Sequence, residues 1–111
     1  MRKTEVSSMM IAEKLSEGWN EITPLPLGPS ITLESVKKNF GQEIRLPNRW
    51  RFAIPHKWDV VKALKWQRDE ILSRTKYDGK TTRGLDGKFS EKRYFLDKLN
   101  RVMGALKELD S

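Results

Sequence analysis

The sequence of 111 residues contains no cysteine and a single histidine, His56. Without cysteine the chain has no disulfide, no thiolate zinc site and no cysteine nucleophile, which favours a reducing compartment. One histidine leaves little material for a histidine-based metal site or a Ser-His-Asp triad. The acidic residues are scattered along the chain, and no glycine-rich phosphate loop is present. The sequence therefore predicts no metal, no cofactor and no enzymatic activity.

Long apolar runs are also missing. No stretch approaches the roughly 18 apolar residues that cross a bilayer. The basic start, MRKTEVSSMM, is not followed by the apolar segment of a secretory signal. We expect a soluble protein without membrane contact, in the cytoplasm or associated with the nucleoid. Its length is that of one domain with one modest core.

Positive charge is what the sequence has in excess, and it is unevenly placed. The 22 Lys and Arg against 15 Asp and Glu give a formal net charge of +7. Residues 1–40 carry five charges of each sign, so the whole excess lies in residues 41–111. The densest stretch, residues 45–68, has seven basic residues and one acid. Such a block creates a positive potential that attracts polyanions.

Several partners fit such a block. We expect nucleic acid, with duplex DNA favoured and association with RNA or the ribosome as an alternative. One alternative is an inhibitor or adaptor that docks its basic face on an acidic protein. The other is a solvated surface that only keeps the protein soluble.

The periodicity of apolar residues predicts an α+β fold that is mostly helical, with about four helices and one short β-hairpin. Helices are expected at about residues 8–17, from Ser30 or Thr32 to Gly41, from Pro55 to about Arg74, and for about 20 residues after a cap at Ser90. In residues 42–54 apolar side chains alternate with arginines around Pro47-Asn48, which predicts a hairpin with the arginines on its open side. The proline-rich residues 19–29 are expected to form an ordered loop with its leucines against the core.

The chain divides into three segments: residues 1–76 as the basic nucleic-acid-binding core, 77–89 as a basic glycine-containing loop, and 90–111 as an amphipathic helix. In this helix an apolar seam recurs at helical spacing. The seam either joins two copies of the chain in a homodimer or packs on the Trp58, Val61 and Ile71 stripe of its own chain. Its residues are Phe95, Leu99, Val102 and Leu106.

A short helix, the segment ITLESVKKNF, and the basic hairpin RWRFAI running into IPHKWDVVKAL follow one another within residues 8–64. This order resembles the winged-helix domain of excisionases and MerR-type regulators. The resemblance implies a second helix in the major groove and a wing that grips the flanking backbone or minor groove. It implies DNA binding, and we expect a small regulator or architectural factor, of the size common in phage-like mobile elements. It assigns the recognition helix Ser30, Thr32, Ser35, Lys37 and Lys38, and the wing Arg45, Arg49 and Arg51.

The residues predicted to contact nucleic acid are basic side chains of these elements and of the 77–89 loop. They are Lys37, Lys38, Arg45, Arg49, Arg51, Lys57, Lys62, Lys65, Arg68, Lys80 and Arg83. Trp50, Phe52 and Trp58 are expected in the core. Trp66 falls on the polar face of its helix, where it either contacts a partner or lies at the rim of the core.

Overall fold

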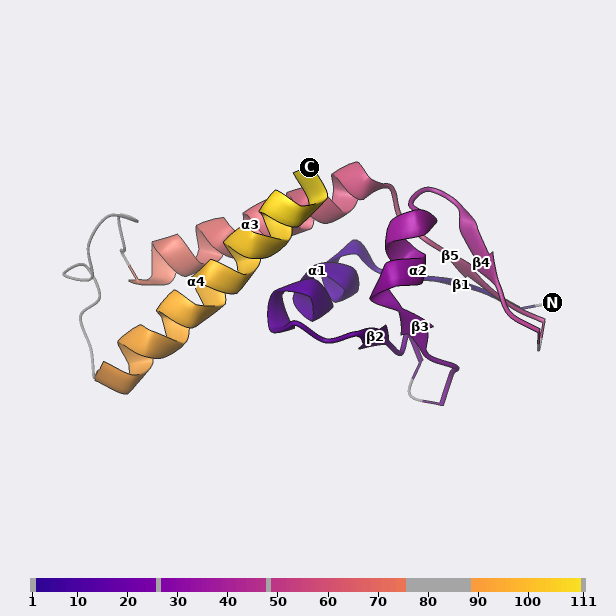
Figure 1. Ribbon diagram of the computed structural model, residues 1–111, viewed down its shortest axis with the longest axis horizontal. Coiled ribbons are helices and arrows are strands. Elements are labelled where there is room, and N and C mark those ends of the chain that lie inside the picture. Colours follow the sequence, from indigo (N-terminus) through magenta and orange to yellow (C-terminus); the bar gives the residue numbers. More distant parts are fainter. Residues whose placement is uncertain (1, 26, 48, 76–88, 111) are drawn as a thin grey trace.

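The computed structural model describes residues 2–25, 27–47, 49–75 and 89–110, and over these residues the chain is α+β and mostly helical, as the periodicity predicts (Figure 1). The helices are α1 (Ser8–Glu17), α2 (Leu33–Lys38), α3 (Lys57–Thr75) and α4 (Phe89–Asp110). The strands are β1 (Arg2–Glu5), β2 (Glu21–Ile22), β3 (Ile31–Thr32), β4 (Glu43–Arg45) and β5 (Trp50–Ala53). None of the helices in this part of the chain is long and apolar enough to cross a membrane.

The first two helices begin at side-chain caps. Ser7 accepts a hydrogen bond from the Met9 N–H at 3.2 Å, and Gly18 ends α1 in the left-handed conformation with φ of 76°. Thr32 accepts a hydrogen bond from the Ser35 N–H at 3.1 Å. The second helix therefore starts after Thr32, and the alternative start at Ser30 is wrong.

The three-stranded sheet contains the predicted hairpin and one unpredicted strand. Its order is β1-β5-β4, with β4 antiparallel and β1 parallel to β5. The central Phe52 is completely buried, as expected, which stabilises the fold by roughly 1.5–3 kcal/mol. The segment before α1 has charged residues and no apolar alternation, so its sequence gives no sign of β1.

The connection between α1 and α2 differs from the expected loop. Its ends pair as the short strands β2 and β3, with Ile22 opposite Ile31 and both side chains buried. Leu27 is fully exposed, so its predicted packing against the core is wrong. In the winged-helix family a tight turn joins these two helices, whereas here a β-ladder does.

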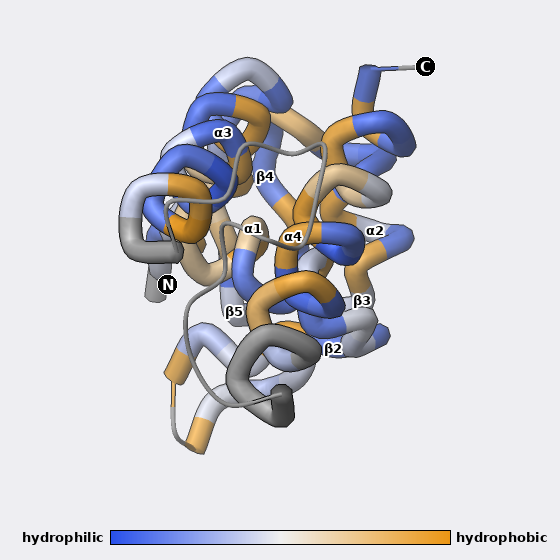
Figure 2. Tube along the Cα trace, turned by 90° about the vertical axis from the view of Figure 1, so that its left-hand side faces the viewer, coloured by the Kyte–Doolittle hydropathy of each residue, from blue (hydrophilic) through white to orange (hydrophobic). Residues whose placement is uncertain are grey.

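The long helices α3 and α4 pack against each other and against α1. Leu99, Val102 and Leu106 are buried in the core of their own chain, and Phe95 is partly buried against it. The structure therefore packs the α4 seam within its own chain, which is the intramolecular alternative; the homodimer stays a prediction. In Figure 2 the hydrophobic positions of α3 and α4 lie toward the middle of the molecule.

Three expectations about these helices need correction. Trp58 is 65% exposed and does not belong to the core stripe, because it lies on the solvent side of α3. Pro55 precedes α3 and does not form its first turn, since the helix starts at Lys57. The last helix begins at Phe89, so Ser90 lies within its first turn and does not cap it.

The molecule measures 53 × 28 × 18 Å along its principal axes. The tip of the β4–β5 hairpin lies at one end of the longest axis, and the end of α3 lies toward the other (Figure 1). The hairpin therefore projects from the helical body.

Candidate nucleic-acid interface

The strand register places three basic residues in one row across the sheet. Arg51 of β5 is the partner of Arg45 on β4 and of Lys3 on β1. We call Lys3, Arg51 and Arg45 the basic row. Like charges directly opposite each other destabilise a strand pair. Among the described residues neither Arg45 nor Arg51 forms a salt bridge, so an external anion would relieve this repulsion.

The tip of the hairpin adds Arg49 beyond the basic row. The Arg49 N–H donates to the Leu46 carbonyl at 3.1 Å, and the Leu46 N–H donates to the Trp50 carbonyl at 3.0 Å. These bonds close a three-residue loop that ends in a left-handed residue, which is a common hairpin connection. Arg49 has φ of 70°, a conformation that costs a non-glycine residue roughly 1–2 kcal/mol. The side chain is exposed at the projecting end of the hairpin.

The opposite face of the hairpin is apolar and stiffens it. Ile44 is the register partner of Phe52, and both belong to the core cluster or pack on it. The rings of Trp50 and Phe52 stack with centroids 6.0 Å apart. Trp50 is only partly buried, so its predicted core position is confirmed in part. One face of the hairpin thus holds the core while the other carries the arginines.

The root of the hairpin is fixed to the beginning of α3. The Gly41 N–H donates to the Pro55 carbonyl at 3.0 Å, and Gly41 has φ of 77°. A Cβ atom at Gly41 would lie 2.6 Å from the Nδ1 atom of His56. His56 therefore packs on a backbone position that only glycine fits, and this contact helps to set the direction of the hairpin.

The second helix offers fewer free groups than the family resemblance implies. Ser30 lies ahead of α2 and is 3.3 Å from the Thr23 hydroxyl. The Thr32 and Ser35 side chains form the helix cap. Both lysines have carboxylate partners: Lys37 pairs with Glu108 of α4, and Lys38 with Glu34 at 3.3 Å. If α2 bound DNA through these side chains, the DNA would have to break or share their ion pairs and cap hydrogen bonds.

The remaining predicted contacts lie along α3 or outside the described residues. Lys57, Lys62 and Lys65 are exposed. The Lys62 ammonium lies 4.1 Å from the centroid of the exposed Trp58 ring, and Arg68 pairs with Asp69 at 3.1 Å. The charged block of residues 45–68 therefore divides between the hairpin and the helix. Lys80 and Arg83 fall in the 77–89 loop, of which only Phe89 is described.

Trp66 lies apart from the basic residues of the hairpin. It is 56% exposed and lines a pocket between α1, α3 and α4 with Gln67. Neither Gln67 nor Lys3 is among the site residues predicted from the sequence. No signal in the sequence identifies Gln67. Lys3 could be identified only by predicting that β1 pairs in parallel with β5.

Comparisons with known proteins and structures identify no relative of the chain. No family model, no curated protein and no solved structure matches the chain. The resemblance to winged-helix regulators therefore stays a prediction, and the candidate interface rests on the register, exposure and charges of its residues.

Proposed function

We propose that the protein binds nucleic acid, duplex DNA in preference, through the β4–β5 hairpin and acts as a small DNA-binding regulator or architectural factor. The observation that carries the proposal is the basic row, in which Arg45 and Arg51 face each other across the hairpin without a salt bridge among the described residues. Phosphate groups would neutralise this row, which favours the bound state.

The shape of the hairpin favours a duplex over a single strand. It carries its arginines on one face and at its tip, and its other face is anchored by Phe52. Arginine presents a rigid fork of donors to phosphate oxygens and base edges. Single-strand binding relies on exposed aromatic platforms among the charges. On the hairpin Trp50 lies on the face opposite Arg51, and on α3 the Lys62 ammonium lies over the ring of the exposed Trp58.

The exposed lysines of α3 extend the positive potential beyond the hairpin. Lys57, Lys62 and Lys65 would speed the encounter with a polyanion and add sequence-independent contacts. Both α2 lysines have carboxylate partners, so we assign α2 a smaller share of the affinity. We therefore expect the main contacts on the hairpin.

Fluorescence anisotropy with labelled duplex DNA, single-stranded DNA and structured RNA, each at about 50 and 200 mM salt, tests the proposal. We expect the duplex to bind most tightly. For about four phosphate contacts the affinity should fall roughly a hundredfold between the two salt concentrations. Absence of binding to all three polymers at the lower concentration would contradict the proposal. A preference for RNA would keep the interface and change the partner.

A further inference from the structure

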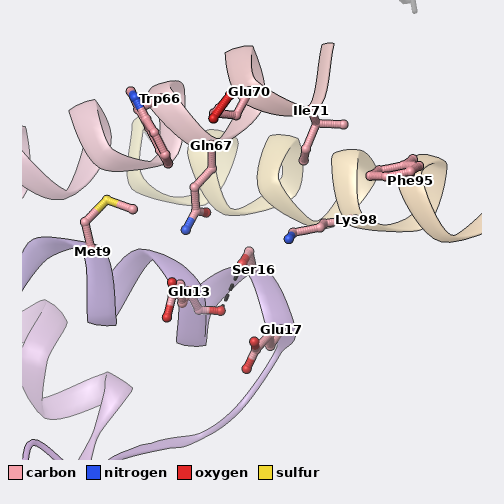
Figure 3. A pocket seen from close by; sticks show the side chains of 10 residues that line it. All are labelled: Met9, Glu13, Ser16, Glu17, Trp66, Gln67, Glu70, Ile71, Phe95 and Lys98. Atoms are coloured by element: carbon pink, nitrogen blue, oxygen red, sulfur yellow. Dashed lines mark hydrogen bonds between the residues drawn. The ribbon is translucent and has the colours of Figure 1, made fainter. Parts of the chain in front are cut away.

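A pocket of about 320 Å³ lies where α1, α3 and α4 meet (Figure 3). This volume is within the range of small-ligand sites, roughly 300–1,000 Å³. The residues that matter for its chemistry come from all three helices. They are Glu13, Glu17, Trp66, Gln67, Phe95 and Lys98.

Gln67 is the feature that calls for an occupant. Its side chain extends from α3 toward α1 in Figure 3 and is only 8% exposed. Its Oε1 atom is buried and has no hydrogen-bond partner among the described residues. Buried polar groups in folded proteins are almost always hydrogen-bonded. A donor that enters the pocket would satisfy this amide.

The pocket is acidic although the protein is basic. Glu13 and Glu17 of α1 line it with exposed carboxylates, and neither forms a salt bridge within the described part of the chain. Lys98 contributes one ammonium group. The two carboxylates and the Gln67 oxygen are all acceptors, so the pocket favours a cationic donor. A nucleic-acid phosphate would be repelled here.

The apolar part of the lining selects among cations. Trp66 of α3 and Met9 of α1 also line the pocket, and Trp66 is 56% exposed although it is a large aromatic residue. A guanidinium group stacks on an indole ring and still presents donors in its plane. A simple ammonium ion lacks this flat shape and is more strongly hydrated.

We propose that this pocket binds an arginine side chain from a basic segment of a partner protein. The guanidinium group donates to Gln67 and to the carboxylates of Glu13 and Glu17, and it stacks on Trp66. The protein then has two separate surfaces: the hairpin for a polyanion and the pocket for a basic peptide. This inference does not depend on nucleic-acid binding.

Two peptides titrated into the full-length, ¹⁵N-labelled protein test the proposal. One is acetyl-Gly-Arg-Gly-amide, and the other has citrulline, the neutral isostere, in place of arginine. We expect the arginine peptide to shift the Gln67 side-chain amide and Trp66 indole resonances. The citrulline peptide should leave both unchanged, because it lacks the charge that the two carboxylates attract.

A double variant and a control variant test whether the two pocket carboxylates bind the guanidinium group. In the Glu13→Gln, Glu17→Gln double variant the affinity for the arginine peptide should fall roughly tenfold or more. The matched control is Glu21→Gln, which removes an exposed acid of β2 that does not line the pocket, and here the affinity should stay within about twofold. All three substituted residues are exposed, so we expect the variants to fold normally.

The remaining outcomes overturn the proposal. These are no shift with either peptide, equal shifts with both, or an equal loss of affinity in Glu21→Gln. If neither peptide shifts the resonances, Gln67 is satisfied by water alone. If Glu21→Gln loses as much affinity as the double variant, the peptide binds only through general charge attraction. Binding of duplex DNA by the double variant separates the two proposals, because it should be no weaker than in the wild type whichever way the peptide result falls.

Discussion

At the scale of single residues, Arg49 combines an unfavourable backbone with an exposed charge. A residue in the left-handed region at a hairpin tip is ordinarily glycine or asparagine. Here it is an arginine with φ of 70°. Backbone strain of this kind persists where the surrounding structure enforces it, and it clusters at functional sites. We infer that the strain is tolerated because it places a positive charge at the tip of the hairpin.

Arg49→Gly should therefore separate stability from binding. The variant relieves the left-handed strain, and its free energy of unfolding should rise by up to about 1 kcal/mol. It also loses one phosphate contact, so affinity for duplex DNA should fall severalfold. Arg49→Ala is the matched control, because it loses the same charge and keeps the strain. Denaturant titrations and anisotropy measure both effects, and a less stable Arg49→Gly would show that the tip is misassigned.

Some residue roles could be predicted from the sequence because they depend on near neighbours. The position of α1, the start of α2 after Thr32 and the burial of Phe52 follow from local patterns. The exposure of Trp58 could not be predicted, because the sequence does not show which side of α3 packs on the other helices. In the structure Val61 and Ile71 are buried and Trp58 is not. The same holds for Gln67, whose neighbours come from α1 and α4.

At the scale of elements, the hairpin and helices follow from periodicity, whereas β1 and the β2–β3 ladder do not. Strand β1 pairs with β5, which lies far along the chain. The β2–β3 ladder consists of only two residue pairs, too few to give a periodic pattern. The apolar seam of α4 is clear in the sequence, but its partner is not. A seam of this kind can face a second copy or its own chain equally well. In the structure α4 packs on α1 and α3, which is the intramolecular alternative.

Leu99→Asp tests this assignment of α4. The substitution places a carboxylate at a site that is 8% exposed, and we expect a loss of at least about 3 kcal/mol and unfolding well below the wild-type midpoint. The control is Met103→Asp on the same helix, where the side chain is 47% exposed and the change should be small. Thermal denaturation followed by circular dichroism measures both. A folded Leu99→Asp variant that changes from dimer to monomer would contradict the assignment.

The contact between the hairpin root and α3 gives a second prediction at this scale. Gly41→Ala adds a Cβ atom against the His56 ring at a residue with φ of 77°, so stability should fall by about 1–3 kcal/mol. Adding His56→Ala should restore the steric part of the loss. Gly104→Ala is the matched control: among the described residues nothing beyond its own helix backbone and chain neighbours lies within 4 Å of an added Cβ. Alanine also favours the helix, so stability should rise by roughly 0.5–1 kcal/mol. Equal thermal midpoints for the two glycine variants would refute the assigned contact.

At the scale of the whole molecule, the net charge of +7 is divided among distinct surfaces. The hairpin presents arginines on one face, the outer side of α3 presents lysines, and the pocket between the helices gathers carboxylates. The sequence predicts the first two surfaces as a single block, because residues 45–68 are contiguous. It does not predict the pocket, whose residues are distributed over 90 positions from Met9 to Lys98.

The salt dependence of duplex binding tests the hairpin interface most directly. Each lost phosphate contact should reduce the slope of log affinity against log salt by about 0.9. Arg45→Ala with Arg51→Ala should therefore lower the slope by roughly 2 and leave stability unchanged or slightly higher, because the like charges no longer face each other. Arg101→Ala with Lys107→Ala removes the same charge from exposed positions of α4 and should preserve most of the slope. Equal slopes for the two double variants would show that the hairpin is not the interface.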